Sequence, residues 1–256
     1  MSSPAPPRYP PKPRSVYFFG TCLMDVFHGR AGVAAVELIE REGVRVIYPQ
    51  DQTCCGQPPF NSGYRQEARR VAEAQMALLA EPIPVVVPSG SCGAMMRAHY
   101  PRLFAGDPAR EAAARAFSAR VFEWSEFMVN VLQARLVDRG APTRVTYHPS
   151  CHLLRELGAG EEPLALLRQL ERVELVPLPQ AEECCGFGGT FSVKYDDISG
   201  AMVADKAENV AGTGAAVLVS ADAGCLMNIG GALARRGQTI AVKPLAAFLK
   251  ERVDGT

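Results

Sequence analysis

Apolar residues gather in three strand-like runs in each half of the chain. The runs cover residues 15–20, 44–53 and 84–91 in the first half, and 144–149, 173–183 and 215–224 in the second. They are rich in β-branched residues or continuously apolar, which is typical of strands that are buried on both faces of a sheet. The pattern therefore predicts three buried strands in each half.

Between these runs lie segments whose apolar residues are spaced three and four positions apart, as an amphipathic helix requires. They cover residues 32–41, 66–79, 162–170 and 199–210, and Gly43 closes the first of them. Strands that alternate with helices indicate parallel sheets, because parallel neighbours need a crossover connection. We expect an α/β fold with two pseudo-symmetric halves, each a small parallel sheet covered by helices.

The domain organisation follows from the segments that fall outside this alternation. Residues 1–14 contain six prolines and lack the apolar core of a secretory signal, so we expect a flexible Pro-rich leader. Residues 15–140 form the first predicted domain, in which 107–139 is a helical connector with Ser125 as an N-cap. Residues 141–256 form the second domain.

The cysteines repeat in the same order as the strands. The first half carries Cys22, Cys54, Cys55 and Cys92, and the second carries Cys151, Cys184, Cys185 and Cys225. The copies are offset by 129, 130 and 133 positions for the first cysteine, the Cys-Cys pair and the last cysteine. Each cysteine follows a predicted strand, and loops at the carboxyl ends of parallel strands converge. The four cysteines of a half can therefore meet in space.

The net charge and the length of the chain exclude some functions for these thiols. The 27 basic and 27 acidic residues cancel, so no global field attracts nucleic acid or an anionic membrane. Every apolar run ends well short of the roughly 18 residues of a membrane span, and we expect a soluble, cytoplasmic protein. A chain of 256 residues buries a core without disulfides. Cytosolic thiols stay reduced, so eight of them indicate metal or redox chemistry.

An iron-sulfur cluster fits the thiols better than the alternatives. Structural zinc sites usually use short C-x(2–4)-C knuckles, which are absent here, and a disulfide between Cys54 and Cys55 would close a strained ring. Four thiolates per half match the ligands of one cluster. Glycines after each pair, such as Gly56 and Gly186, let backbone N–H groups approach it. We predict that all eight cysteines bind metal as cluster ligands, four to each centre.

The sequence gives weaker support for a functional role of other side chains near the cysteines. His148 and His152 flank Cys151 and can ligate iron or relay a proton, although a hydrogen-bonding role is commoner for such histidines. Lys194 and Tyr195 can neutralise a substrate carboxylate or a cluster, but a surface lysine is at least as common. The Walker and Rossmann fingerprints are absent, so no nucleotide cofactor is expected.

Five longer motifs carry a resemblance to a known family. They are FGTCLMD (19–25), CCGQPPFNSG (54–63), PSGSC (88–92), CCGFGGTFSVKY (184–195) and DAGCLMNIGG (222–231). They resemble the cysteine-rich CCG domain that occurs twice in one of the subunits of heterodisulfide reductase and in glycolate oxidase iron-sulfur subunits, and in particular the LutA-type iron-sulfur subunits of bacterial L-lactate utilisation complexes.

The resemblance implies an electron-transfer subunit with two iron-sulfur clusters of 4Fe-4S type, in a complex that oxidises L-lactate to pyruvate. It also implies other subunits as partners, including a ferredoxin-like iron-sulfur subunit, and no activity of the chain alone. The alternatives are a glycolate oxidase-type or heterodisulfide reductase-type subunit, a thiol-disulfide enzyme without metal, and a binding module that the metal sites only brace.

One departure from the family pattern concerns the last cysteine of each half. The fuller pattern ends in C-x-x-C, whereas Ser89 and Asp222 occupy the first position of that pair here. Four cysteines per half are the count for an ordinary cubane cluster, which favours electron relay over disulfide reduction. An oxygen of Asp222 can still ligate iron, although it is a harder donor than a thiolate.

Overall fold

The computed structural model describes residues 9–256, in which the secondary structure repeats between the halves. Strands are labelled β, α-helices α and π-helices η. The first half contains β1 (Ser15–Phe18), α1 (Cys22–Phe27), α2 (Gly29–Arg41), β2 (Arg45–Ile47), α3 (Gln57–Asn61), α4 (Arg65–Leu78), β3 (Val85–Val87), α5 (Gly90–Ala94), η1 (Met95–His99), α6 (Tyr100–Leu103), α7 (Pro108–Ser118), β4 (Val121–Glu123), α8 (Trp124–Glu126) and η2 (Phe127–Val131). The second contains β5 (Thr143–His148), η3 (Leu153–Leu157), α9 (Glu161–Leu167), β6 (Val173–Val176), α10 (Phe191–Lys194), α11 (Asp196–Gly212), β7 (Val217–Ser220), α12 (Ala223–Arg235), β8 (Ala241–Pro244) and α13 (Leu245–Asp254).

Each half is built on a parallel sheet of four strands. The strand orders are β2-β1-β3-β4 and β6-β5-β7-β8, so the two sheets have the same topology. The fold class predicted from the sequence, α/β with two similar halves, is confirmed. The helices expected at 32–41, 66–79, 162–170 and 199–210 are present as α2, α4, α9 and α11.

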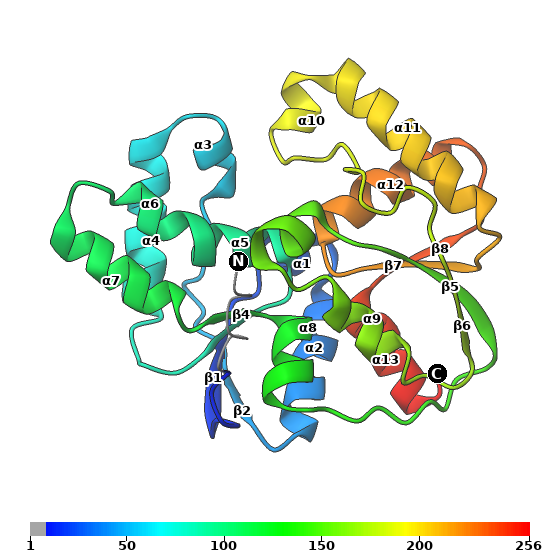
Figure 1. Ribbon diagram of the computed structural model, residues 1–256, viewed down its shortest axis with the longest axis horizontal. Helices are drawn as coiled ribbons and strands as arrows, with labels where there is room; N and C mark the ends of the chain where they lie inside the picture. The colour runs from blue at the N-terminus through cyan, green and yellow to red at the C-terminus, as the bar shows by residue number, and fades with distance from the viewer. Residues whose placement is uncertain (1–8) are drawn as a thin grey trace, which may run out of the picture.

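Helices cover both faces of each sheet, and one set of them lies between the sheets. Figure 1 shows α11 and α12 on one side of the second sheet, with α9 and α13 on the other. Helices α2, α9 and α13 share one apolar cluster with residues of both sheets, such as Phe18 and Val145. The outer faces have their own clusters, one under α4 and α6 and one under α11 and α12. The two halves therefore bury a common core.

The expected helical connector at 107–139 is wrong in two places. Strand β4 interrupts it and adds a fourth strand to the first sheet, and no regular element follows η2 before β5. Strand β8 extends the second sheet in the same way. The two strands have only three and four residues, each includes a charged residue, and no cysteine follows them to mark their place in the repeat.

The predicted N-cap is also wrong, because Glu123 caps α8 in place of Ser125. The Glu123 carboxylate accepts hydrogen bonds from the backbone N–H groups of Ser125 and Glu126, at 2.8 and 3.2 Å. The Glu126 carboxylate accepts from the Glu123 N–H at 3.2 Å, which completes a capping box. The sequence signal for this cap was the pair of glutamates three positions apart.

The buried Glu123 makes stability depend on pH. Desolvation by burial raises the pKa of Glu123 to about 8, so the folded state holds its proton more tightly than the unfolded state, whose carboxyl has a pKa of about 4.3. Stability should therefore fall as pH rises from about 5 to 8. Glu123→Gln keeps an acceptor without a titrating group and should flatten this fall in urea unfolding at pH 5.5 and 8. Exposed Glu67→Gln is the control, and an equal fall in Glu123→Gln and the parent would contradict the expectation.

Residues 9–14, which belong to the expected flexible leader, contact the first half. Residues 1–8 lie outside the described part of the chain. The Tyr9 hydroxyl donates to the Glu126 carboxylate at 3.1 Å, and its ring packs against Phe122. The Arg14 carbonyl accepts from the Arg45 N–H at 3.0 Å. Residues 9–14 are thus joined to the first half.

A buried ion pair anchors the segment that connects the first half to the second. Asp138 binds the guanidinium of Arg252 on α13 with both carboxylate oxygens at 2.8 Å. Asp138 also accepts from the N–H groups of Gly140 and Arg172. The predicted boundary at residue 140 lies in this segment. Within residues 9–256, no helix combines the length and apolarity that crossing a membrane requires.

Candidate metal centre

All eight cysteines line one cavity of about 370 Å³ to which both halves contribute. They lie in the loops or first helical turns that follow β1, β2 and β3 and β5, β6 and β7, at the carboxyl ends of the strands. All eight have free thiols. Cys55, Cys92, Cys185 and Cys225 are buried. The structure thus brings together every residue that the sequence analysis selected as a cluster ligand, although these loops come from two different sheets.

The thiols of each quartet shift one another's pKa. Hydrogen bonds from Cys22 and Cys55 hold the pKa of Cys54 well below its usual range. In the second quartet, hydrogen bonds from Cys151 and Cys185 do the same to the pKa of Cys184. A thiolate is the form that binds metal, so the lowered pKa of Cys54 and Cys184 favours metal binding at these two sulfurs.

Glycine follows each Cys-Cys pair because the backbone turns through the left-handed region there. Gly56 has φ +86° and Gly186 has φ +80°. A Cβ on Gly186 would lie 2.7 Å from the carbonyl oxygen of Ser199, so no other residue fits without a shift. The turn directs the Gly186 N–H to the Cys184 sulfur at 3.4 Å. Such N–H donors stabilise thiolates and the sulfurs of iron-sulfur clusters.

Ser89 and Asp222, which stand where the family pattern has further cysteines, bind each other across the two halves. The Ser89 hydroxyl donates to Asp222 Oδ2 at 3.1 Å, and the Ser91 N–H donates to the same oxygen at 2.9 Å. Asp222 Oδ1 accepts from the Gly224 N–H at 3.1 Å and caps α12. Asp222 is buried. This pair therefore links the halves beside the cavity.

The two histidines named from the sequence lie close to the second quartet. His152 lines the cavity, with Nδ1 at 3.6 Å from Cys151 Sγ. His148 is buried at the end of β5, and one of its ring nitrogens lies within 4.8 Å of the sulfurs of Cys185 and Cys225. Burial, followed by the charge of Lys206, lowers the pKa of His148 to about 4. The imidazole is thus neutral at pH 7.

Lys194 and Tyr195 are not among the residues that line the cavity. Lys194 lies over the ring of Tyr64, 5.9 Å from its centroid, and Tyr195 is exposed. Among the described residues, no lysine or arginine lines the cavity. The structure therefore gives no support to the hypothesis that Lys194 neutralises a carboxylate in this cavity. Its walls hold sulfur donors and His152, but neither lysine nor arginine that could pair with a free organic acid.

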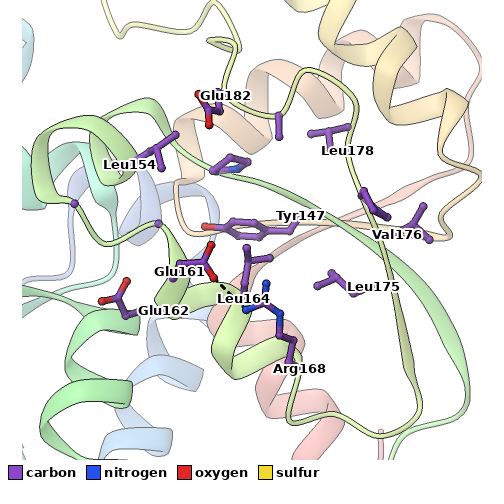
Figure 2. Close-up of a pocket in the computed structure, with 15 residues that line it drawn as sticks. Tyr147, Leu154, Glu161, Glu162, Leu164, Arg168, Leu175, Val176, Leu178 and Glu182 are labelled. Atoms are coloured by element: carbon purple, nitrogen blue, oxygen red, sulfur yellow. Dashed lines mark hydrogen bonds and ion pairs between the residues drawn. The ribbon is translucent and has the colours of Figure 1, made fainter.

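A second cavity, of about 760 Å³, lies beside α9 and β6 and is lined by no cysteine. Figure 2 shows Leu175, Val176 and Leu178 on one side of it and Leu164 on the other. Arg168 pairs with Glu161 at 3.1 Å. This cavity was not predicted from the sequence, because most of its lining residues are apolar and resemble ordinary core, and its three glutamates and Arg168 form no recognisable motif. It offers no set of metal donors, so the cysteine cavity is the candidate metal centre.

Comparisons with known proteins agree with the internal repeat. A model of the cysteine-rich CCG domain matches residues 16–97 and 145–230. "Lactate utilization protein A" of Geobacillus thermodenitrificans is 48% identical over 93% of this chain and 99% of its own length. The proteins of the same name from Shouchella clausii and Bacillus velezensis are 44% and 46% identical, also over 93% of this chain.

One solved structure shares the fold over the whole chain. It is a hypothetical protein from Helicobacter pylori, with a TM-score of 0.67 and 9% identity. The match covers 100% of this chain and 52% of that one. At so low an identity it shows the likeness of fold alone.

Proposed function

The chain belongs to the lactate utilization A proteins with two cysteine-rich CCG domains, and from this we propose that it is an iron-sulfur electron-transfer subunit of a complex that oxidises L-lactate to pyruvate. The observation that carries the proposal is the arrangement of two matched cysteine quartets around one cavity. We place the complex in the cytoplasm and expect the other lactate utilisation subunits, including a ferredoxin-like one, as partners.

The donor set of the cavity fits two iron-sulfur clusters. Cys22, Cys54, Cys55 and Cys92 would hold one, and Cys151, Cys184, Cys185 and Cys225 the other. Thiolate sulfur is the usual protein ligand of such clusters, and the Gly186 N–H already points at a ligand sulfur. When bound, each cluster would supply a site that gains and loses one electron. The chain's own residues hold the sulfurs in place around the cavity.

We propose that the chemistry on lactate takes place in a partner subunit, and the lack of lysine and arginine among the described residues that line the cavity supports this. Oxidation of lactate to pyruvate releases two electrons and two protons. A site for this reaction needs a positive group for the carboxylate and a base for the hydroxyl proton. The described residues that line the cavity include neither lysine nor arginine. Two one-electron centres are instead suited to receive the two electrons in turn.

Iron and acid-labile sulfide counts on anaerobically purified protein test this proposal. If both clusters are of 4Fe-4S type, each chain should carry about eight irons and about eight labile sulfides. Lactate should reduce these centres only when the partner subunits are present. Zinc without labile sulfide would contradict the proposal, as would reduction by lactate of the chain alone.

A thiol-disulfide enzyme remains the second candidate, and one observation favours it. The lowered pKa values of Cys54 and Cys184 are what a nucleophilic thiol needs. Such an enzyme would show a reversible two-electron thiol titration in metal-free protein, without visible absorbance. Iron and sulfide in the amounts given above, with no such titration, would exclude it.

A further inference from the structure

His148 is a buried imidazole without a hydrogen-bond partner. It is the last residue of the central strand β5 and is 1% exposed. Neither ring nitrogen has a partner within the described part of the chain. Buried polar groups are nearly always satisfied, because an unsatisfied one loses its hydration without compensation. An imidazole left in this state at the edge of a cysteine cluster indicates a missing partner of another kind.

The surroundings of this imidazole are those of a metal ligand. One ring nitrogen and the sulfurs of Cys185 and Cys225 all lie within 4.8 Å of one another. Imidazole nitrogen and thiolate sulfur bind the same transition metals, iron and zinc among them. The three donors come from the end of β5, the loop after β6 and the first turn of α12, and they converge on one place.

The repeat supplies an internal comparison. Phe19 precedes His148 by 129 positions, the same offset that separates Cys22 from Cys151. Phe19 is fully buried and shares an apolar cluster with Cys55 and Cys92. The first quartet therefore has a hydrocarbon ring where the second has an imidazole, and the two halves differ at this position in their ability to bind metal.

Ser220 provides a polar group near His148. The two residues are paired in register on β5 and β7, so their side chains lie on the same face of the sheet. The Ser220 hydroxyl is buried and, among the described residues, also lacks a partner. A histidine that ligates a metal usually hydrogen-bonds through its other ring nitrogen, and this hydroxyl is placed to take that role.

We propose that a ring nitrogen of His148 is a ligand of the metal centre in the second half. In this proposal His148 takes the place of one of the four cysteines as a ligand, so the second centre is a mixed thiolate and imidazole site, while the first is held by four thiolates. This inference rests on the proposed function, because it requires a metal centre in the cavity. A neutral imidazole leaves less negative charge on the metal than a thiolate does, so the second centre should be reduced at a higher potential than the first.

The test uses full-length protein grown with 15N-labelled histidine, purified anaerobically and reduced in steps. Iron and labile sulfide are counted first, and pulsed EPR then measures nitrogen hyperfine coupling to the reduced centres. A strong coupling that changes with the isotope is expected at the centre with the higher potential. Full iron and sulfide without nitrogen coupling would overturn the role of His148 alone. Absence of iron and sulfide would instead overturn the proposed function.

Two variants identify the histidine. His148→Phe, which copies the residue of the first half, should lose the coupling, whereas His152→Phe should keep it. Loss of the coupling in His152→Phe, or its retention in His148→Phe, would overturn the assignment. If His148→Phe fails to fold, the labelled parent and His152→Phe still decide the matter, because a coupling retained in His152→Phe comes from His148, the other histidine near the quartets. His148→Cys should lower the potential of the second centre and leave the first unchanged, which a packing role would not do.

Discussion

Replacing Cys54 by serine should remove about half of the iron and labile sulfide, and Cys184→Ser should remove the other half. Each of these cysteines is the thiol that accepts hydrogen bonds from two neighbours of its quartet, and its pKa is lowered for that reason. A serine hydroxyl is a harder donor than a thiolate and is mostly protonated at neutral pH, so it is a poor substitute. Without this ligand a centre with four cysteines is incomplete.

The measurement is an iron and sulfide count together with low-temperature EPR on each variant, purified without oxygen. The two variants are matched controls for each other, because the repeat places them at equivalent positions. Each should lose one EPR signal and keep the other. Loss of both signals in either variant would indicate one shared centre, and retention of both would show that the replaced cysteine is no ligand.

Asp222→Ala should destabilise the metal-free protein by about 2–4 kcal/mol. The carboxylate of Asp222 accepts hydrogen bonds from the Ser89 hydroxyl and from the N–H groups of Ser91 and Gly224. Its removal leaves three donors without their acceptor at a buried site, and each unsatisfied buried group costs about 1–3 kcal/mol before relaxation and water access reduce the sum. The change also removes an N-cap from α12 and a link between the halves.

Urea unfolding of the apoprotein measures this effect without the contribution of bound metal. Asp107→Ala is the matched control, because Asp107 also caps a helix, α7, through the Arg110 N–H at 3.2 Å. It is only half-buried and makes no such link between halves, so its loss should cost about 1 kcal/mol. An Asp222→Ala variant that is no less stable than Asp107→Ala would contradict the structural role of the link.

The amino-acid sequence by itself determined the repeat, the parallel α/β architecture and the choice of the eight cysteines. These features are local. A buried strand shows itself in a run of apolar residues, a helix in a period of three to four, and a ligand quartet in spacings that occur twice. Strands β4 and β8 were not predicted because they are short, each includes a charged residue, and no cysteine follows them to mark their place in the repeat. The glutamate cap of α8 was not predicted because Ser125, two positions after Glu123, is also a good capping residue.

Only the tertiary structure decided how the halves meet. That both quartets face one cavity, that Ser89 binds Asp222, and that His148 lies without a partner behind Cys185 and Cys225 all depend on packing. Ser89 and Asp222 are 133 positions apart, and no periodicity reports a contact over such a distance. The core between the sheets, which joins α2, α9 and α13, sets the angle and distance at which the two sets of strand ends face each other. The number and spacing of the cysteines are therefore properties of the sequence, while their convergence on one cavity follows from the packing of the halves.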